Sequence, residues 1–212
     1  MEEFLESKNR MTLTEQVRQM LKGVIDPIAE FLNRIGLAPN TITILGLIGN
    51  VIGAALLING KMTLGGIVIL VTAPLDALDG TMARLRGENR TDSSSTFGAF
   101  LDSVIDRYAE LAIYGGLLVY FALHGVWIGV ILAYLAAAGS ILVSYTRARA
   151  QALGIETKIG FLTRLERYLV LVPALVFNIP LIGLWILAIF SNFTAFQRIL
   201  DVYRKMNSQK IR

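Results

Sequence analysis

The sequence predicts an all-α polytopic membrane protein with six transmembrane helices and an N-terminal amphipathic helix on the membrane surface. Of its 212 residues, 54% are hydrophobic and only 17% are charged, a balance richer in apolar side chains than that of soluble domains. The apolar residues form runs close to the roughly 20 residues that a helix needs to cross a bilayer. Lysines and arginines lie almost entirely between or beside these runs, as is typical of membrane proteins.

The N-terminal helix is predicted over residues 12–35. Thr12 and Glu15 have the spacing of a capping box, which favours a helix start. Pro27 is expected to kink or divide this helix. The helix either lies on the membrane surface or packs on other cytoplasmic elements. Its apolar residues recur at helical spacing and are Val17, Met20, Val24, Ile28, Phe31 and Ile35.

Six apolar segments follow, and each is predicted to form one transmembrane helix. Pro39 and Asn40 mark the turn before the first segment. Pro74 frees a backbone carbonyl in the second segment and is expected to bend that helix. The fifth segment has an apolar part of only about 12 residues, too short to span a bilayer alone, and is expected to extend into the cytoplasm. The predicted ranges are 41–59, 63–84, 97–123, 126–150, 164–177 and 179–197.

We expect residues 1–212 to form a single membrane-embedded domain. It comprises a juxtamembrane segment over residues 1–38, a six-helix core over 39–197 and a cytoplasmic tail over 198–212. Residues 1–36 are charged and lack a compact apolar core, so no cleavable signal peptide is expected. The chain has no cysteine, which excludes disulfides and thiolate metal sites.

The distribution of basic residues predicts the orientation in the membrane. All of the 20 lysines and arginines except Lys61 and Arg107 lie in segments on one side of the predicted helices. By the positive-inside rule, both termini and the polar connection between the second and third helices face the cytoplasm. These segments account for the net charge of +4, and no basic stripe with interleaved aromatic residues predicts a nucleic-acid partner.

Four aspartates lie at facing ends of the second and third predicted helices. Asp76 and Asp79 are three residues apart, and Asp102 and Asp106 are four apart, so each pair projects from one helix face. In an antiparallel helix pair the two sets fall at similar depth, and the four carboxylates can converge. Four such charges repel one another and are costly to desolvate, which favours two divalent cations held by oxygen ligands. The alternative is a pair of transmembrane helices with incidental acids near their ends.

The wider pattern reads D-x-x-D-G-x-x-A-R, then a spacer, and then G-x-x-x-D-x-x-x-D. It resembles the signature of the CDP-alcohol phosphotransferase family, whose members are also called phosphatidyltransferases. Residues 85–97 make the spacer longer than is usual in that family, and their polar excess is interpreted as a longer loop. The residues that carry the resemblance are Asp76, Asp79, Gly80, Ala83, Arg84, Gly98, Asp102 and Asp106.

This resemblance implies a metal-dependent enzyme of phospholipid biosynthesis in a prokaryotic cell membrane, assembled as a homodimer. Such an enzyme transfers a phosphatidyl-type group from a CDP-linked lipid, CDP-diacylglycerol or CDP-archaeol, to an alcohol and releases CMP. The resemblance also implies two Mg²⁺ or Mn²⁺ ions held by Asp76, Asp79 and Asp102. Asp106 is implied as the general base and as a further metal contact. The implied CDP-lipid site is lined by Gly80, Ala83, Arg84 and Gly98.

Basic residues gather in segment 144–167, between the fourth and fifth predicted helices. They either anchor the helices to lipid head groups or form an anion pocket, since guanidinium groups suit phosphate oxygens. The segment resembles motifs of phosphatidylinositol-phosphate synthases and their archaeal counterparts, although Gln151, Thr163 and Leu165 depart from them. That resemblance implies inositol phosphate as the acceptor, with glycerol 3-phosphate, serine or another small alcohol as alternatives. The implied residues for the acceptor phosphate are Arg147, Arg149, Lys158, Arg164 and Arg167.

Two other functional classes are weighed against this enzyme. A divalent-cation transporter would also use intramembrane aspartates, but the residues between Glu110 and position 130 are almost wholly apolar, which counts against a conduction path. A lipid-binding scaffold without chemistry would not need four acids at this spacing. The sequence therefore favours an enzyme.

Overall fold

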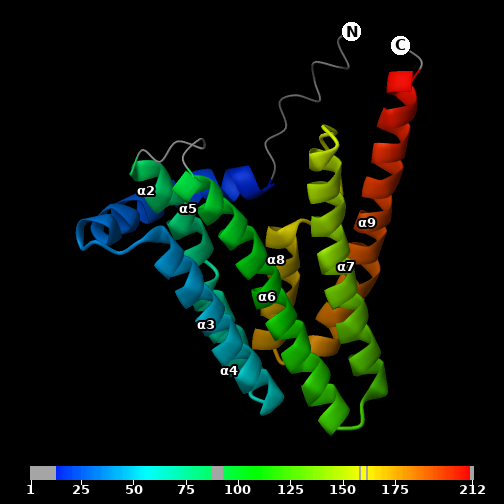
Figure 1. The fold of residues 1–212 in the computed structure, drawn as a ribbon. Coiled ribbons are helices and arrows are strands. Elements are labelled where there is room, and N and C mark those ends of the chain that lie inside the picture. Colours follow the sequence, from blue (N-terminus) through cyan, green and yellow to red (C-terminus); the bar gives the residue numbers. More distant parts are fainter. Residues whose placement is uncertain (1–12, 87–92, 158, 161, 211–212) are drawn as a thin grey trace. The chain divides into compact units, whose positions relative to one another are not determined.

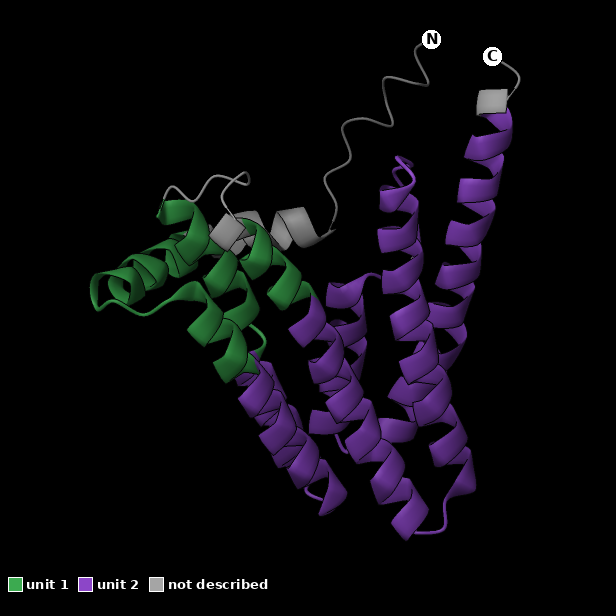
Figure 2. Cartoon of the chain, in the orientation of Figure 1, with its two compact units in different colours: residues 1–46, 73–103 green, residues 47–72, 104–212 purple. Residues whose placement is uncertain are grey.

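The structure is a computed structural model that describes residues 13–86, 93–157, 159–160 and 162–210. Helices are the only regular elements in these ranges, which confirms the predicted all-α class (Figure 1). The chain forms two compact units, coloured separately in Figure 2 and described separately below. Unit 1 comprises residues 1–46 and 73–103, and unit 2 comprises residues 47–72 and 104–212.

Unit 1 is built around the packing of α2 on α5. The Asn33 side chain donates to the carbonyl oxygen of Met82, and Arg86 donates to Asn33 and to the carbonyl oxygen of Leu37. Its helices are α2 (Leu13–Arg34), the first turns of α3 (Pro39–Ile58), α5 (Leu75–Leu85) and the start of α6 (Ser93–Leu123). Its apolar core consists of Ile25, Ala29, Ile42, Leu78 and Met82.

Helix α2 continues through Pro27, so the division considered at this position does not occur. A proline removes only one backbone hydrogen bond, and apolar packing on both sides of it can hold the helix together. Ile25 and Ala29 supply that packing, since both are buried in the core of unit 1.

Pro74 breaks the helix that was predicted over residues 63–84. Two helices form instead, α4 (Met62–Thr72) and α5, which begins at Leu75. Proline has no N–H group and its ring obstructs the preceding turn, so the helix ends before it. The Pro74 carbonyl then accepts hydrogen bonds from the N–H groups of Ala77 and Leu78, which start α5.

Unit 2 contains the remaining helical segments. Helices α7 and α9 lie side by side in it (Figure 1), and they approach closely at Gly139, where a Cβ atom would lie 2.8 Å from Cβ of Ser191. The complete helices of the unit are α4, α7 (Trp127–Ala152), α8 (Arg164–Val176) and α9 (Pro180–Lys210), together with the later turns of α3 and α6. Its core includes Leu57, Ile69, Ile113, Leu117, Leu132, Leu175, Leu184 and Leu187.

Two helices are longer than predicted. Helix α6 begins at Ser93 rather than at residue 97, because serine and threonine favour the start of a helix. Helix α9 continues to Lys210, whereas the sequence predicted its end at residue 197. The tail is basic, but it also carries apolar residues at helical spacing. Ile199, Tyr203 and Met206 continue the spacing of the preceding segment.

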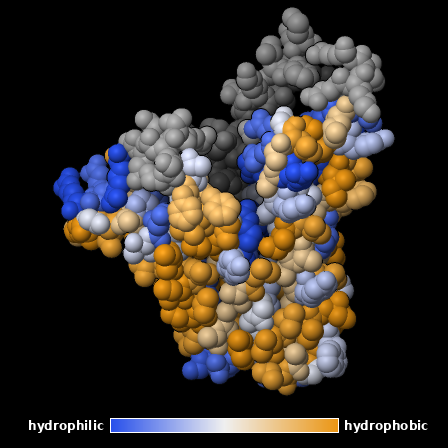
Figure 3. Space-filling view, viewed as in Figure 1, coloured by the Kyte–Doolittle hydropathy of each residue, from blue (hydrophilic) through white to orange (hydrophobic). Residues whose placement is uncertain are grey.

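Apolar side chains cover the outside of the helices, as Figure 3 shows for one face. In unit 2 the exposed apolar residues include Leu123, Ile131 and Tyr134, and such surfaces are typical of helices that contact lipid. The chain is therefore an integral membrane protein. The described segments that are long and apolar enough to cross a bilayer are Pro39–Ile58, Met62–Leu85, Trp127–Ala152 and Pro180–Ser208.

Candidate active site

The break at Pro74 determines where the first two aspartates lie on α5. Asp76 is exposed in the first turn, and Asp79 follows one turn later with an exposed fraction of only 5%. The Thr43 hydroxyl donates to Oδ2 of Asp79 at 2.5 Å, and the backbone N–H of Gly80 donates to Oδ1 at 2.5 Å. These two hydrogen bonds fix the orientation of the Asp79 carboxylate.

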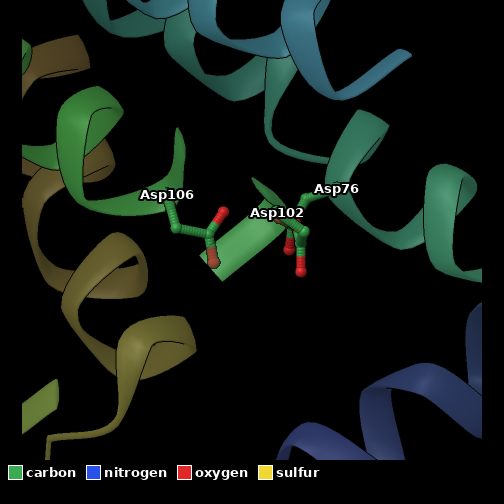
Figure 4. A group of neighbouring side chains, drawn as sticks. All are labelled: Asp76, Asp102 and Asp106. Atoms are coloured by element: carbon green, nitrogen blue, oxygen red, sulfur yellow. The ribbon is translucent and has the colours of Figure 1, made fainter. Parts of the chain in front are cut away.

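Three aspartates on α5 and α6 lie together. One carboxylate oxygen from each of Asp76, Asp102 and Asp106 lies within 4.8 Å of the others, and Figure 4 shows these side chains pointing toward one another. Asp102 and Asp106 are one turn apart on the continuous helix α6, and Asp76 shares unit 1 with Asp102. The convergence predicted for four aspartates is thus seen for three, which we call the carboxylate group. Among the described residues, Asp79 is not part of it.

The carboxylate group fits a divalent cation. All of its donors are oxygens, which Mg²⁺ and Mn²⁺ prefer over nitrogen or sulfur. Three negative charges this close to one another repel unless positive charge lies among them. A cation held here can bind phosphate oxygens of a substrate at its remaining positions.

The residues predicted for the CDP-lipid site all belong to unit 1. At Gly98 a Cβ atom would lie 3.2 Å from Oδ1 of Asn40, so a larger residue would crowd the first turn of α3. Arg84 is exposed, and its Nη2 donates to the Thr81 hydroxyl at 2.7 Å. The four predicted residues are Gly80, Ala83 and Arg84 on α5 and Gly98 on α6.

Two ion pairs connect α6 with α8 within unit 2. Nη1 of Arg164 lies 2.6 Å from Oδ2 of Asp106. One turn further along both helices, Arg167 donates from Nε and Nη2 to Oε1 of Glu110, at 3.0 and 2.7 Å. Arg164 therefore contacts a member of the carboxylate group, whereas Arg167 is buried against Glu110 and does not present its guanidinium to solvent.

The remaining basic residues of the predicted acceptor site have different surroundings. Arg147 and Arg149 lie near the end of α7, and both are exposed. Lys158 lies outside the described residues. Arg198 of α9, which was not predicted for this site, is within electrostatic range of Arg147 and Arg167.

Helix α9 binds the connection between α7 and α8 through a polar stripe, formed by Thr194, Arg198 and Lys205. Their spacing along the helix places them on one face. In the part of the chain that the structure describes, the stripe's hydrogen bonds with other segments are to backbone groups, and those of Arg198 and Lys205 measure 2.6 to 3.0 Å. Thr194 accepts from the N–H of Leu162, Arg198 donates to the carbonyls of Val143 and Ile159, and Lys205 donates to the carbonyl of Glu156.

Sequence reasoning missed Thr43 and Arg198. Thr43 belongs to a polar turn whose composition gives no sign of a contact with Asp79, 36 residues away. Arg198 had a signal, because it lies one helical turn after Thr194, close to the end of an apolar segment. The same spacing predicts that α9 continues beyond residue 197.

A family model, curated relatives and solved structures all match this chain over most of its length. The family model for CDP-alcohol phosphatidyltransferase matches residues 36–196. An archaetidylinositol phosphate synthase of Pyrococcus horikoshii is 34% identical over 197 residues, covering 92% of this chain and 98% of that protein. A crystal structure of Mycobacterium tuberculosis phosphatidylinositol phosphate synthase with CDP-DAG bound has a TM-score of 0.76 and 34% identity, covering 85% of this chain and 94% of its own. A second structure of that enzyme, with manganese and citrate, has a TM-score of 0.77 and 34% identity, covering 84% and 88%.

Proposed function

Since the chain belongs to the CDP-alcohol phosphatidyltransferase family, it is an enzyme, and we propose that it transfers a phosphatidyl-type group from a CDP-linked lipid to inositol phosphate with release of CMP. The observation that carries this proposal is the carboxylate group, whose oxygens lie within 4.8 Å of one another. Such a group suits chemistry at a diphosphate, because cations bound there offset the charge of the phosphate oxygens.

The donor is proposed to be CDP-diacylglycerol or CDP-archaeol. The solved relative with CDP-DAG bound supports the first, and the relative named archaetidylinositol phosphate synthase supports the second. Gly80 and Gly98 leave room for close approach of the nucleotide, since neither carries a side chain. Ala83 and Arg84 are proposed to complete this site, with the exposed Arg84 guanidinium facing the diphosphate.

Asp76, Asp79, Asp102 and Asp106 are the proposed ligands of two Mg²⁺ or Mn²⁺ ions. The all-oxygen donor set supports this assignment, and so does the solved relative that contains manganese. When bound, the ions supply positive charge to the diphosphate oxygens and to the departing CMP. The Asp79 carboxylate can accept its two hydrogen bonds and still bind a cation, because a carboxylate has about four lone-pair sites.

Asp106 is the proposed general base. It takes the proton of the acceptor hydroxyl while that oxygen bonds to the lipid-linked phosphorus. The bond between this phosphorus and the oxygen of the CMP phosphate breaks, and CMP leaves with the electron pair. Arg164 contacts Asp106 at 2.6 Å and orients its carboxylate.

The acceptor is proposed to carry its own phosphate. Arg164 is the best placed of the described basic residues, because it adjoins the proposed base and remains 29% exposed. Arg147 and Arg149 are exposed and can bring further charge, and Lys158 is proposed with them from its sequence position. Arg167 contributes indirectly, since Glu110 occupies its guanidinium. Two relatives named for inositol phosphate products support inositol phosphate over glycerol 3-phosphate or serine.

The proposed topology has six membrane-spanning segments in one functional domain. The third and fifth of these are α6, which carries the charged residues of the site, and the short helix α8. Helix α2 is proposed to lie on the membrane surface, with the site and both termini in the cytoplasm of a prokaryotic cell. A homodimer is proposed from the resemblance to the family. Protease accessibility in oriented membrane vesicles tests this orientation.

The test of function is CMP release by the purified protein in detergent with CDP-diacylglycerol and Mg²⁺. Inositol phosphate, glycerol 3-phosphate, serine and free inositol are compared as acceptors. Inositol phosphate is expected to be used best, and Arg164→Gln is expected to raise its KM while Arg34→Gln, an exposed arginine of α2, does not. Efficient use of serine or free inositol would overturn the acceptor assignment. Cation flux into liposomes without CMP release would support a transporter instead.

A further inference from the structure

Four charged side chains of unit 2 form two ion pairs between α6 and α8. Asp106 and Glu110 are four residues apart on α6, and Arg164 and Arg167 are three apart in the first turn of α8. Each pair of residues therefore shares one helix face. The closest distances are 2.6 Å for Arg164 with Asp106 and 2.7 Å for Arg167 with Glu110. The two acids, one turn apart on α6, thus pair with the two arginines, one turn apart on α8.

The two ion pairs differ in their access to solvent. The side chains of Arg167 and Glu110 are 2% and 5% exposed, whereas those of Arg164 and Asp106 are 29% and 12% exposed. A buried pair is held firmly, because removing one partner leaves an uncompensated charge in a dry environment. The partly exposed Arg164 can instead exchange its contact with the buried Asp106 for a contact with a substrate. The ion pair of Arg164 with Asp106 is therefore the one that can open toward the acceptor.

The guanidinium of Arg167 makes its hydrogen bonds within the protein. Nε and Nη2 donate to Glu110, and Nη1 donates to the carbonyl oxygen of Leu162 at 3.2 Å. The only acid in the first turn of α8, Glu166, accepts from the backbone N–H of Thr163 in a capping box. Through Arg167, the carboxylate of Glu110 on α6 therefore holds the first turn of α8.

We propose that Glu110 is a positioning residue for the acceptor, an inference that rests on the proposed function. By holding Arg167, Glu110 keeps the first turn of α8 where the Arg164 guanidinium can move between Asp106 and the acceptor phosphate. Arrival of the phosphate draws Arg164 from Asp106, which keeps its contact with Arg107 at 3.4 Å. The buried pair holds α8 in place during this exchange.

The experiment compares Glu110→Gln with wild type in purified, detergent-solubilised protein, using inositol phosphate and CDP-diacylglycerol. The variant keeps the shape of the side chain and loses its charge. Displacement of Arg164 by a fraction of an ångström is expected to raise the acceptor KM roughly tenfold or more, because small misplacements of binding groups are costly. The donor KM is expected to stay within about twofold of wild type, since Gly80, Ala83 and Arg84 lie on α5 and Gly98 lies 12 residues before Glu110 on α6. Glu30→Gln, which removes an exposed ion pair with Arg34, is the matched control.

Further variants separate positioning from a general loss of folding. Arg167→Lys keeps the charge but loses the forked contact, and it should reproduce the rise in acceptor KM. If Glu110 acts only through Arg167, adding Glu110→Gln to Arg167→Gln should change the acceptor KM little further. A folded Glu110→Gln protein with the wild-type acceptor KM, or with equal rises in both KM values, would overturn the inference. Failure of the wild type to use inositol phosphate would instead overturn the proposed function.

Discussion

The hydroxyl of Thr43 lies 2.5 Å from Oδ2 of Asp79 and links two helices through residues that are 36 positions apart. Both residues are buried, with exposed fractions of 8% and 5%. Water therefore competes little for this bond, and the Gly80 N–H holds the other carboxylate oxygen. Asp79 is kept in one orientation beside the carboxylate group before any ligand binds.

Replacing Thr43 by valine should weaken metal activation without changing the fold. Partners that orient a metal ligand typically contribute roughly 10- to 100-fold to affinity or activity, and we expect a loss in this range. The measurement is CMP release as a function of Mn²⁺ concentration, where the half-saturating concentration should rise. Thr43→Ser keeps the hydroxyl and should retain most activity. Normal Mn²⁺ activation of the valine variant would show that this hydrogen bond does not support a metal ligand.

Removal of divalent cations should abolish activity, and Mg²⁺ or Mn²⁺ should restore it. Asp76→Asn and Asp102→Asn each remove one charge from the carboxylate group, so the loss should exceed the roughly 10- to 100-fold cost of a lost supporting contact. Asp79→Asn should behave in the same way. CMP release after chelation and after readdition of metal is the measurement, with Glu30→Gln as the control. Full activity in excess chelator would contradict the metal assignment.

Asp106→Asn should still bind the CDP-linked lipid but turn over slowly. Loss of a general base typically costs about 10² to 10⁴ in rate, and the amide cannot accept the hydroxyl proton. Donor binding measured by calorimetry and single-turnover CMP release separate the two effects. Near-normal turnover would reassign Asp106 to metal binding or to holding Arg164.

Gly160→Ala should destabilise the protein. Gly160 has a φ of +126°, and a Cβ atom there would overlap Cγ2 of Thr194 on α9. Strain of this kind costs about 1–3 kcal/mol, so the unfolding temperature in detergent should fall. Gly115→Ala is the control, because a Cβ atom at Gly115 meets nothing within 4 Å.

A second substitution tests the cause of that effect. Thr194→Ser removes the methyl group that the new Cβ atom would meet and keeps the hydroxyl that accepts from Leu162. Adding it to Gly160→Ala should recover part of the lost unfolding temperature. An unchanged unfolding temperature in Gly160→Ala itself would contradict the close approach of this connection to α9.

Local spacing made the helices and part of the site predictable. The three- and four-residue separations of the aspartates depend only on helical geometry, and Asp76, Asp102 and Asp106 do lie together. The start of α8 was also predictable, and it begins at Arg164 as expected. Pro74 was expected to bend a helix, but whether a proline bends or ends a helix depends on the packing around it.

The sequence did not predict which side chains far apart along the chain contact one another. Arg167 was expected to face a phosphate, yet the structure buries it against Glu110, 57 residues away. A basic residue near a helix end looks the same in sequence whether it faces a ligand, lipid or a buried acid. Only the packing of α8 on α6 distinguishes these environments, and that packing arises from tertiary contacts.

The polar stripe of α9 has a consequence for how this enzyme can change in evolution. Thr194, Arg198 and Lys205 bind backbone groups of the α7–α8 connection, so these hydrogen bonds do not depend on which side chains the connection carries. Substitutions at the exposed Glu156 leave the hydrogen bond from Lys205 to its carbonyl in place, whereas Ile155 and Thr157 are buried and tolerate less change. The carboxylate group has no such freedom, because its side chains are the proposed metal ligands. Redesign toward a different alcohol should accordingly leave the aspartates untouched.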